Sequence, residues 1–212
     1  IENGIEYMGF SEHIPLVFPD GFQALYRMPE ELTEDYFNTV NSLKEKYKNE
    51  IEIKIGFEME YYSGLFEDML DNARKSGGEY LILGHHFIYP EYPVKRYCGY
   101  DDITREELEL YADSVVEAMK TGVFSYVAHP DVINFTEDSS LFKEQMRKIC
   151  VASRELEIPL EINFLGIRQK RYYPNDLLWQ VAGEEKSPVT FGFDAHDAMS
   201  AYDGDSLLIA KE

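Results

Sequence analysis

All five histidines of the sequence lie at or just after the end of a predicted β-strand. Acidic side chains stand at two of the same strand ends. Together these residues are His13, Glu58, His85, His86, His129, Asp194 and His196. Because the carboxyl ends of parallel strands share one face of an α/β protein, we expect these side chains to surround one cavity. Imidazoles and carboxylates in that arrangement suit Zn, Mn or Fe, and their number indicates two or three divalent ions.

Some of these residues have a second interpretation. Any single histidine, or one Asp–His pair, could instead form a structural hydrogen bond, so only the whole set indicates a metal site. His85 and His86 are neighbours on one strand and face opposite sides, so one of the two is expected to bind metal. Asp194 and His196 are two residues apart at the end of a strand predicted over 189–193, so they should point the same way.

Other charged residues near these strand ends could extend the site. The acidic neighbours of the candidate ligands are Glu12, Glu60, Asp131 and Asp197. They are either carboxylates that orient the ligands or solvated loop charges. The only basic cluster of this acidic chain consists of Arg168, Lys170 and Arg171. It is either a solvated loop or a phosphate anchor, since a guanidinium holds phosphate through two hydrogen bonds. Metal ions beside a phosphate anchor would suit hydrolysis of a phosphate ester.

Alternating strand and helix patterns position these residues. Strands are predicted at 7–10, 51–57, 80–83, 125–128, 159–162 and 189–193. Helices are predicted at 32–47, 64–76, 104–120, 140–156, 175–183 and from about 205, with the end of another over 1–5 and a basic loop over 166–174. Repeated βα units without a break in composition predict an α/β fold with a parallel sheet, either doubly wound or closed, in a single domain over 1–212.

The composition limits the class of protein. With 212 residues, 44% of them hydrophobic, the chain is long enough for one domain with a buried core. Its net charge of −20 repels phosphate backbones, so nucleic acid is not an expected partner. The sequence has no apolar run long enough to span a membrane and no secretory signal, so neither a membrane partner nor export is expected. Its two cysteines, far apart in the sequence, fit a reducing cytoplasm. Dinucleotide, P-loop and Gly-x-Ser-x-Gly motifs are absent, and no oligomeric state is indicated.

Six short motifs occur in the order found in the PHP (polymerase and histidinol phosphatase) superfamily. They are Gly9-Phe-Ser-Glu-His13, Gly56-Phe-Glu58, Leu83-Gly-His-His86-Phe, Ala128-His-Pro-Asp131, Glu161-Ile-Asn163 and Gly192-Phe-Asp-Ala-His196-Asp. The chain most resembles the monofunctional histidinol-phosphatase branch, over essentially its whole length. The resemblance implies a distorted seven-stranded β/α barrel with a trinuclear metal site. By position it implies the metal ligands His13, Glu58, His86, His129, Asp194 and His196. His86 is preferred to His85 because the family's ligand directly precedes an aromatic residue, here Phe87.

The resemblance also implies an activity. The expected reaction is metal-dependent hydrolysis of L-histidinol phosphate, a small-molecule phosphate ester, to L-histidinol and phosphate. Arg168 is the expected phosphate-binding residue. Asp194 and His196 are expected to act in catalysis, by helping to move a proton, as well as in metal binding. The alternatives are a PHP phosphoesterase for another small phosphate or nucleotide, and an inactive fragment with an incomplete metal site.

One part of the family's pattern is missing from the sequence. The family begins with a strand that ends in His-x-His and supplies further metal ligands, and no such segment precedes residue 7. The six predicted strands are also one fewer than the family's seven. We therefore expect a barrel without its first strand, either because the chain is truncated or because the natural protein has lost that element. Such a barrel would have two unpaired edges.

Overall fold

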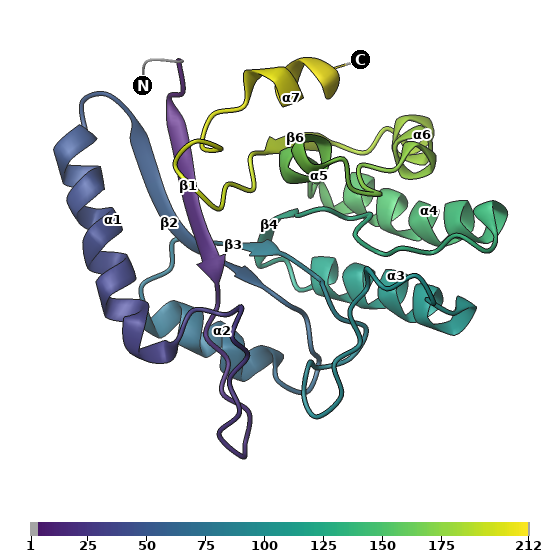
Figure 1. The fold of residues 1–212 in the computed structure, drawn as a ribbon, viewed down its shortest axis with the longest axis horizontal. Helices are drawn as coiled ribbons and strands as arrows, with labels where there is room; N and C mark the ends of the chain where they lie inside the picture. The colour runs from purple at the N-terminus through teal and green to yellow at the C-terminus, as the bar shows by residue number, and fades with distance from the viewer. Residues whose placement is uncertain (1–3, 212) are drawn as a thin grey trace.

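The computed structural model describes residues 4–211 and has one parallel sheet of six strands in the order β1-β2-β3-β4-β5-β6 (Figure 1). Each strand pairs with the next one along the chain. The strands are β1 (Tyr7–His13), β2 (Glu52–Met59), β3 (Tyr80–Leu83), β4 (Phe124–Val127), β5 (Leu160–Asn163) and β6 (Val189–Gly192). Parallel neighbours require crossovers, so helices connect successive strands.

The crossover helices pack on the outer side of the sheet (Figure 1). They are α1 (Thr33–Tyr47), α2 (Phe66–Lys75), α3 (Arg105–Lys120), α4 (Ser139–Leu156), α5 (Phe164–Gln169) and α6 (Asp176–Glu185), with η1 (Glu30–Leu32) before α1 and α7 (Gly204–Ile209) after β6. Their apolar faces and the outer face of the strands form the main core, which includes Phe57, Tyr111 and Phe142. A smaller core lies under α1 around Val40 and Ile55.

Local sequence signals explain where the helices begin. The side chain of Thr104 accepts a hydrogen bond from the backbone N–H of Glu107, whose carboxylate accepts one from the backbone N–H of Thr104. This capping box starts α3 at the residue that the sequence indicates. The side chain of Asp138 caps α4 by accepting from two backbone N–H groups of its first turn, and that of Asn175 caps α6 by accepting from one.

The predicted α/β fold and parallel sheet are confirmed, and all six predicted strands are present. The basic loop predicted over 166–174 is wrong in its first part, because α5 occupies Phe164–Gln169. The side chain of Asn163 accepts a hydrogen bond from the backbone N–H of Gly166 and caps this helix. The helix end predicted over 1–5 lies mostly outside the described residues.

The last strand is shorter than predicted, and this changes the geometry after it. Strand β6 ends at Gly192, and Asp194 has a left-handed backbone with φ of 45°. Asp194 and His196 are therefore not alternate residues of one strand, and the reasoning that aligned them is wrong. Both residues nevertheless line the same cavity, because the chain turns back over the sheet after β6.

The sheet curls so that its two edge strands border one cavity. Residues of both β1 and β6 line the space on the inner side of the sheet, opposite the helices. Of the two topologies left open by the sequence, this curled sheet with helices outside corresponds to the barrel type. No helix in residues 4–211 is long and apolar enough to cross a membrane.

Candidate metal centre

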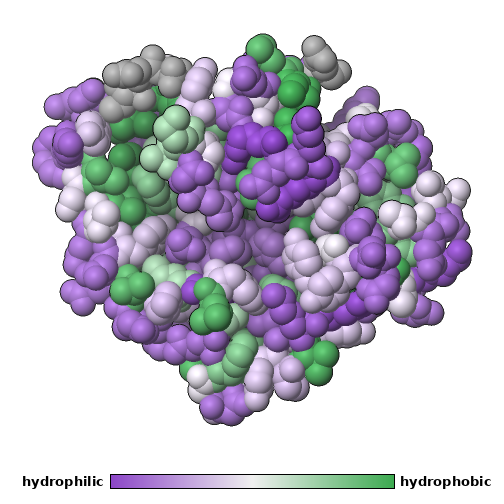
Figure 2. Space-filling view, in the orientation of Figure 1, coloured by the Kyte–Doolittle hydropathy of each residue, from purple (hydrophilic) through white to green (hydrophobic). Residues whose placement is uncertain are grey.

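The concave side of the sheet holds a cavity of about 1000 Å³. Its walls include side chains from β1 and β6 and from the turns that follow β4 and β6. Figure 2 shows a hollow, hydrophilic centre on the face of the molecule that it presents. Most of the candidate ligands line this cavity, namely His13, Glu58, His129, Asp194 and His196. The strand ends therefore meet around one space, as parallel topology requires.

Three candidate ligands lie close enough to share an ion. One ligand atom from each of His13, Glu58 and His86 lies within 4.8 Å of the others. Nε2 of His13 is 3.9 Å from one carboxylate oxygen of Glu58, and Nε2 of His86 is 3.5 Å from the other. Two ligands bonded at about 2.1 Å to a tetrahedral ion are roughly 3.4 Å apart, so these separations fit one shared cation.

His129 contacts the same carboxylate, and its ring lies beside that of His86, with ring centroids 4.5 Å apart. Its Nε2 lies 3.2 Å from Oε1 of Glu58, while its Nδ1 is buried and has no hydrogen-bond partner among the described residues. Burial raises the pKa of Glu58, but the imidazoles of His13, His129 and His86 outweigh it and hold the pKa below its usual range. Glu58 is thus an anion beside three imidazole Nε2 atoms, and a divalent ion bound by the carboxylate and these nitrogens would balance its charge.

The sheet register produces this convergence. His13 is the direct partner of Glu58 across the β1–β2 pair, so both side chains emerge at the same level. The chain leaves β3 through Gly84, which packs against Glu58 so closely that a Cβ atom there would lie 1.9 Å from the carboxylate. Only glycine leaves this space for Glu58 to reach across the sheet. His86 then approaches Glu58 from the turn after β3.

His129 sits at a strained position at the end of β4. Its φ is 30°, which L-residues rarely adopt. The backbone N–H of His129 donates to Oε2 of Glu161 at 2.9 Å, and this bond holds the turn in place. Burial raises the pKa of Glu161 to about 7, although His129 and Asn163 oppose the shift. A charged residue inside the buried strand β5 was the signal in the sequence for this role, and our candidate ligands did not include it.

Asp194 and His196 form a second group across the cavity. Nδ1 of His196 lies 3.3 Å from Oδ1 of Asp194, and the side chain of His196 is 68% exposed. Oδ2 of Asp194 accepts a hydrogen bond from Nδ2 of Asn163, which also donates to Glu161. Asp194 is therefore linked through Asn163 and Glu161 to the turn that carries His129. The structure does not bring His196 into the group around Glu58.

Glu60 orients His86, whereas His85 faces away from the centre. Oε1 of Glu60 lies 2.8 Å from Nδ1 of His86, and Oε2 accepts from the backbone N–H of His86 at 2.8 Å. A carboxylate on Nδ1 leaves Nε2 free to bind metal. His85 is buried between the rings of Tyr62 and Tyr111, and burial lowers its pKa to about 4. Of the two neighbouring histidines, the structure groups His86 with His13 and Glu58.

The other acidic neighbours differ in their surroundings. Glu12 is exposed, and its carboxylate accepts a hydrogen bond from the backbone N–H of His13. Asp131 is buried and accepts from the backbone N–H of Asn175, so it fixes the start of α6. Asp197 accepts from two backbone N–H groups of the turn after it. None of these three belongs to the group that the described residues form around Glu58.

The basic residues after β5 are engaged with the chain. Nη1 of Arg168 donates to the carbonyl of Phe193 at 2.9 Å and to Asp203 at 3.1 Å, and Nη2 donates to the carbonyl of Asp194 at 3.1 Å. Arg168 therefore holds the backbone that carries Asp194. Nη1 of Arg171 donates to the hydroxyl of Tyr173, whose ring lies 6.1 Å from the ring of His129.

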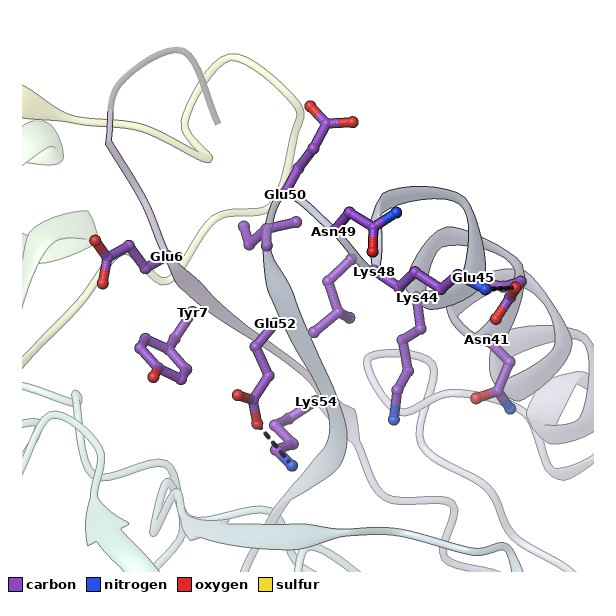
Figure 3. A pocket seen from close by; sticks show the side chains of 12 residues that line it. Glu6, Tyr7, Asn41, Lys44, Glu45, Lys48, Asn49, Glu50, Glu52 and Lys54 are labelled. Atoms are coloured by element: carbon purple, nitrogen blue, oxygen red, sulfur yellow. Dashed lines mark hydrogen bonds and ion pairs between the residues drawn. The ribbon is translucent and has the colours of Figure 1, made fainter.

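A second depression, of about 640 Å³, lies beside β1, β2 and the C-terminal part of α1 (Figure 3). Its charged side chains pair with one another, as in the contact of 2.9 Å between Lys54 and Glu52 and in the pair of Lys48 with Glu45. No histidine is among the described residues that line it. It has the character of a solvated charged surface and lacks the ligands of a metal site.

The comparisons with known proteins agree with this geometry. The chain is 27% identical to histidinol-phosphatase of Bacillus subtilis (strain 168), over 93% of this chain and 84% of the relative. A candidate histidinol phosphatase from Listeria monocytogenes has a similar structure, with a TM-score of 0.74 at 20% identity, covering 97% of this chain and 89% of the other.

A histidinol phosphate phosphatase from Lactococcus lactis subsp. lactis Il1403, solved with zinc, L-histidinol and phosphate, has a TM-score of 0.64 at 21% identity and covers 99% of this chain and 83% of the other. At these identities the two structures establish the fold, which agrees with the barrel expected from the resemblance. Residues 1–164 match the PHP domain, more than half of the chain. The chain therefore belongs to the PHP domain family, and its resemblance to the histidinol-phosphatase branch is confirmed.

Proposed function

We propose that this protein hydrolyses L-histidinol phosphate to L-histidinol and inorganic phosphate at a divalent metal centre in the cavity. The observation that carries the proposal is the convergence of three imidazole Nε2 atoms, from His13, His86 and His129, on the partly buried carboxylate of Glu58. The identity of the relatives supports the substrate, since the Bacillus subtilis protein is a histidinol-phosphatase. The zinc, L-histidinol and phosphate bound to the Lactococcus protein support the metal and the ligand class.

The chain offers two groups of ligands. The first ion would be held by His13, Glu58 and His86, with Glu58 also reaching His129. The second group is Asp194 with His196, which would complete a centre of up to three ions, of Zn, Mn or Fe. Arg168 fixes the backbone of Asp194, and the exposed side chain of His196 is free to turn toward an ion bound beside it.

Bound ions in such a centre supply a Lewis acid that lowers the pKa of a water and neutralises charge on the phosphoryl oxygens. The remaining chemistry falls to side chains of the cavity. Asp194 is placed to accept a proton at Oδ1, because Oδ2 is occupied by the hydrogen bond from Asn163. His196, 3.3 Å from Oδ1, could pass that proton to solvent because its side chain is exposed.

Arg168 remains our proposed phosphate-binding residue. Its guanidinium already donates to the backbone at Phe193 and Asp194, so it would bind phosphate only through its remaining N–H groups. Arg171 is the second arginine to be tested for phosphate binding. It comes from the same segment, and its guanidinium contacts Tyr173, whose ring lies beside that of His129. Substituting each arginine by methionine and measuring KM would separate them. Removal of a phosphate-binding arginine should raise KM at least tenfold.

The function is tested by release of phosphate from L-histidinol phosphate with Mn²⁺ or Zn²⁺ added. Turnover that a chelator abolishes and that exceeds the rate on mononucleotides and other small phosphate monoesters is the expected result. A higher rate on another ester would support a PHP phosphoesterase of different specificity instead. Absence of turnover together with less than about one bound ion per chain would favour an inactive fragment.

A further inference from the structure

Arg27 is the single lysine or arginine that is buried among the described residues. It lies in the segment between β1 and η1, and its exposure is 4%. Two buried acidic residues, Glu60 and Glu91, lie on either side of it, exposed by 1% and 4%. An isolated charge in such an interior would be very unfavourable, so this group is stable only as a set of ion pairs.

The guanidinium of Arg27 makes three separate contacts. Nε donates to Oε1 of Glu91 at 2.5 Å, and Nη1 donates to the carbonyl oxygen of Ile14 at 3.2 Å. Nη2 has no hydrogen-bond partner among the described residues, and its contact with Oε1 of Glu60, at 4.0 Å, is an ion pair without a hydrogen bond. The other oxygen of Glu91 accepts a hydrogen bond from the hydroxyl of Tyr62 at 2.5 Å. Hydrogen bonds thus fix the planar guanidinium at Nε and Nη1, and its contact with Glu60 is electrostatic.

Two of these contacts lead directly to candidate metal ligands. Ile14 follows His13, so the bond to its carbonyl restrains the backbone at the end of β1. Glu60 holds both Nδ1 and the backbone N–H of His86. Arg27 therefore connects, from the side away from the cavity, two of the three ligands in the group of His13, Glu58 and His86.

The same contacts join two loops that border the site. Arg27 belongs to the loop after β1, and Glu91 belongs to the loop between β3 and α3. Farther out, the hydroxyl of Tyr92 donates to Asp20, and its ring stacks on Phe22 with centroids 4.6 Å apart. Several contacts therefore hold the two loops together, among them the stacking of Tyr26 on Phe87, and the pair of Arg27 with Glu91 is buried.

We propose that Arg27 is a positioning residue for the metal centre, which sets the separation of His13 and His86 through Ile14 and Glu60. With Glu60 held in place, the proton of His86 stays on Nδ1 and Nε2 faces the ion. The inference rests on the proposed metal site but not on the substrate, because every contact lies on the side of the ligands away from the cavity.

The test measures metal binding by the whole chain after removal of bound metal, without substrate. Zn²⁺ affinity is obtained by competition with a chromophoric chelator, and the visible spectrum of bound Co²⁺ reports the ligand geometry. We expect Arg27→Met to weaken binding of the first ion about 10- to 100-fold and to change the Co²⁺ spectrum. Arg27→Lys should recover part of the affinity, since a lysine keeps the charge but lacks the planar fork.

Arg147→Met is the matched control, because it removes the same charge from an exposed pair with Glu184 and Glu185. Its Zn²⁺ affinity should stay within about twofold of the unmodified protein. A folded Arg27→Met protein with unchanged affinity and Co²⁺ spectrum would overturn the proposal. If that variant does not fold, Arg27→Lys and Glu91→Gln decide, and unchanged metal binding in both would overturn it. Failure of phosphate release with normal metal binding would instead count against the proposed function alone.

Discussion

Replacing Gly84 by alanine should disable the metal centre without unfolding the protein. A Cβ atom at Gly84 would lie 1.9 Å from Oε1 of Glu58 and 2.5 Å from its Cγ and Cδ atoms. Ordinary contacts of a Cβ atom begin at 3.4 Å, so the carboxylate would have to move by about 1.5 Å, the difference between the two distances. The colliding atoms belong to the end of a flexible side chain, so Glu58 can turn into the cavity while the backbone stays in place.

The displacement is large compared with the tolerance of a metal site. Ligand distances in such sites hold to within about 0.2 Å, so a carboxylate moved by several times that distance is lost as a ligand. Removing one ligand of the first ion should weaken metal binding by at least about 100-fold, more than the loss of an outer hydrogen bond. The unfolding free energy should fall by only about 1–3 kcal/mol, the cost of the broken contact with His129.

The assay compares Zn²⁺ affinity, phosphate release and urea unfolding of Gly84→Ala with those of Gly183→Ala. Gly183 lies in α6, and a Cβ atom there would meet nothing within 4 Å. That control should bind metal normally and gain up to about 1 kcal/mol of stability from the higher helix propensity of alanine. Unchanged metal affinity in a folded Gly84→Ala protein would refute the assignment of Glu58 as the central ligand.

Four further outcomes are expected. In the metal-free protein burial lowers the pKa of His129, but the hydrogen bond and charge of Glu58 raise it to about 9, above 6.5 in the unfolded chain. This stabilisation, on the order of 3 kcal/mol, should be complete below pH 6.5 and lost as the pH rises through 9. Urea unfolding in the presence of a chelator should show this decline in stability. The decline should be absent in His129→Gln. His86→Ala, which also removes a ligand of the first ion, should lower Zn²⁺ affinity at least about 100-fold. His85→Leu should leave Zn²⁺ affinity and stability unchanged or improved, because both nitrogens of His85 are buried without a hydrogen-bond partner among the described residues. Asp194→Asn should reduce kcat by about 100-fold or more while the urea midpoint hardly changes, and full turnover in that variant would contradict a catalytic role.

Much of the fold and part of the site follow from local sequence patterns. The period of apolar residues predicts six strands and most helices, and capping residues such as Thr104 predict where a helix starts. Because parallel strands end on one face, histidines and acids at strand ends were expected to meet, and His13, Glu58, His86 and His129 do so. Periodicity predicts the strands and helices because it depends only on residues close together in the chain. The meeting of the strand ends then follows because all strands of a parallel sheet run in the same direction.

Other features depend on contacts between distant segments and have no local signal. The carboxylate of Asp194 is held by a hydrogen bond from Asn163, which lies 31 positions away in the chain. Arg168 holds the left-handed turn at Asp194 through a hydrogen bond to its carbonyl oxygen. From its residue type alone, Arg168 would be assigned only to phosphate binding.

Arg27 shows the same limit most clearly, since its partner Glu91 is 64 positions away in another loop and neither residue belongs to a periodic pattern. Sequence alone determined which residues end the strands and therefore which could bind a metal. Tertiary structure decided how they are held, because buried charges find their partners only when the loops have packed together.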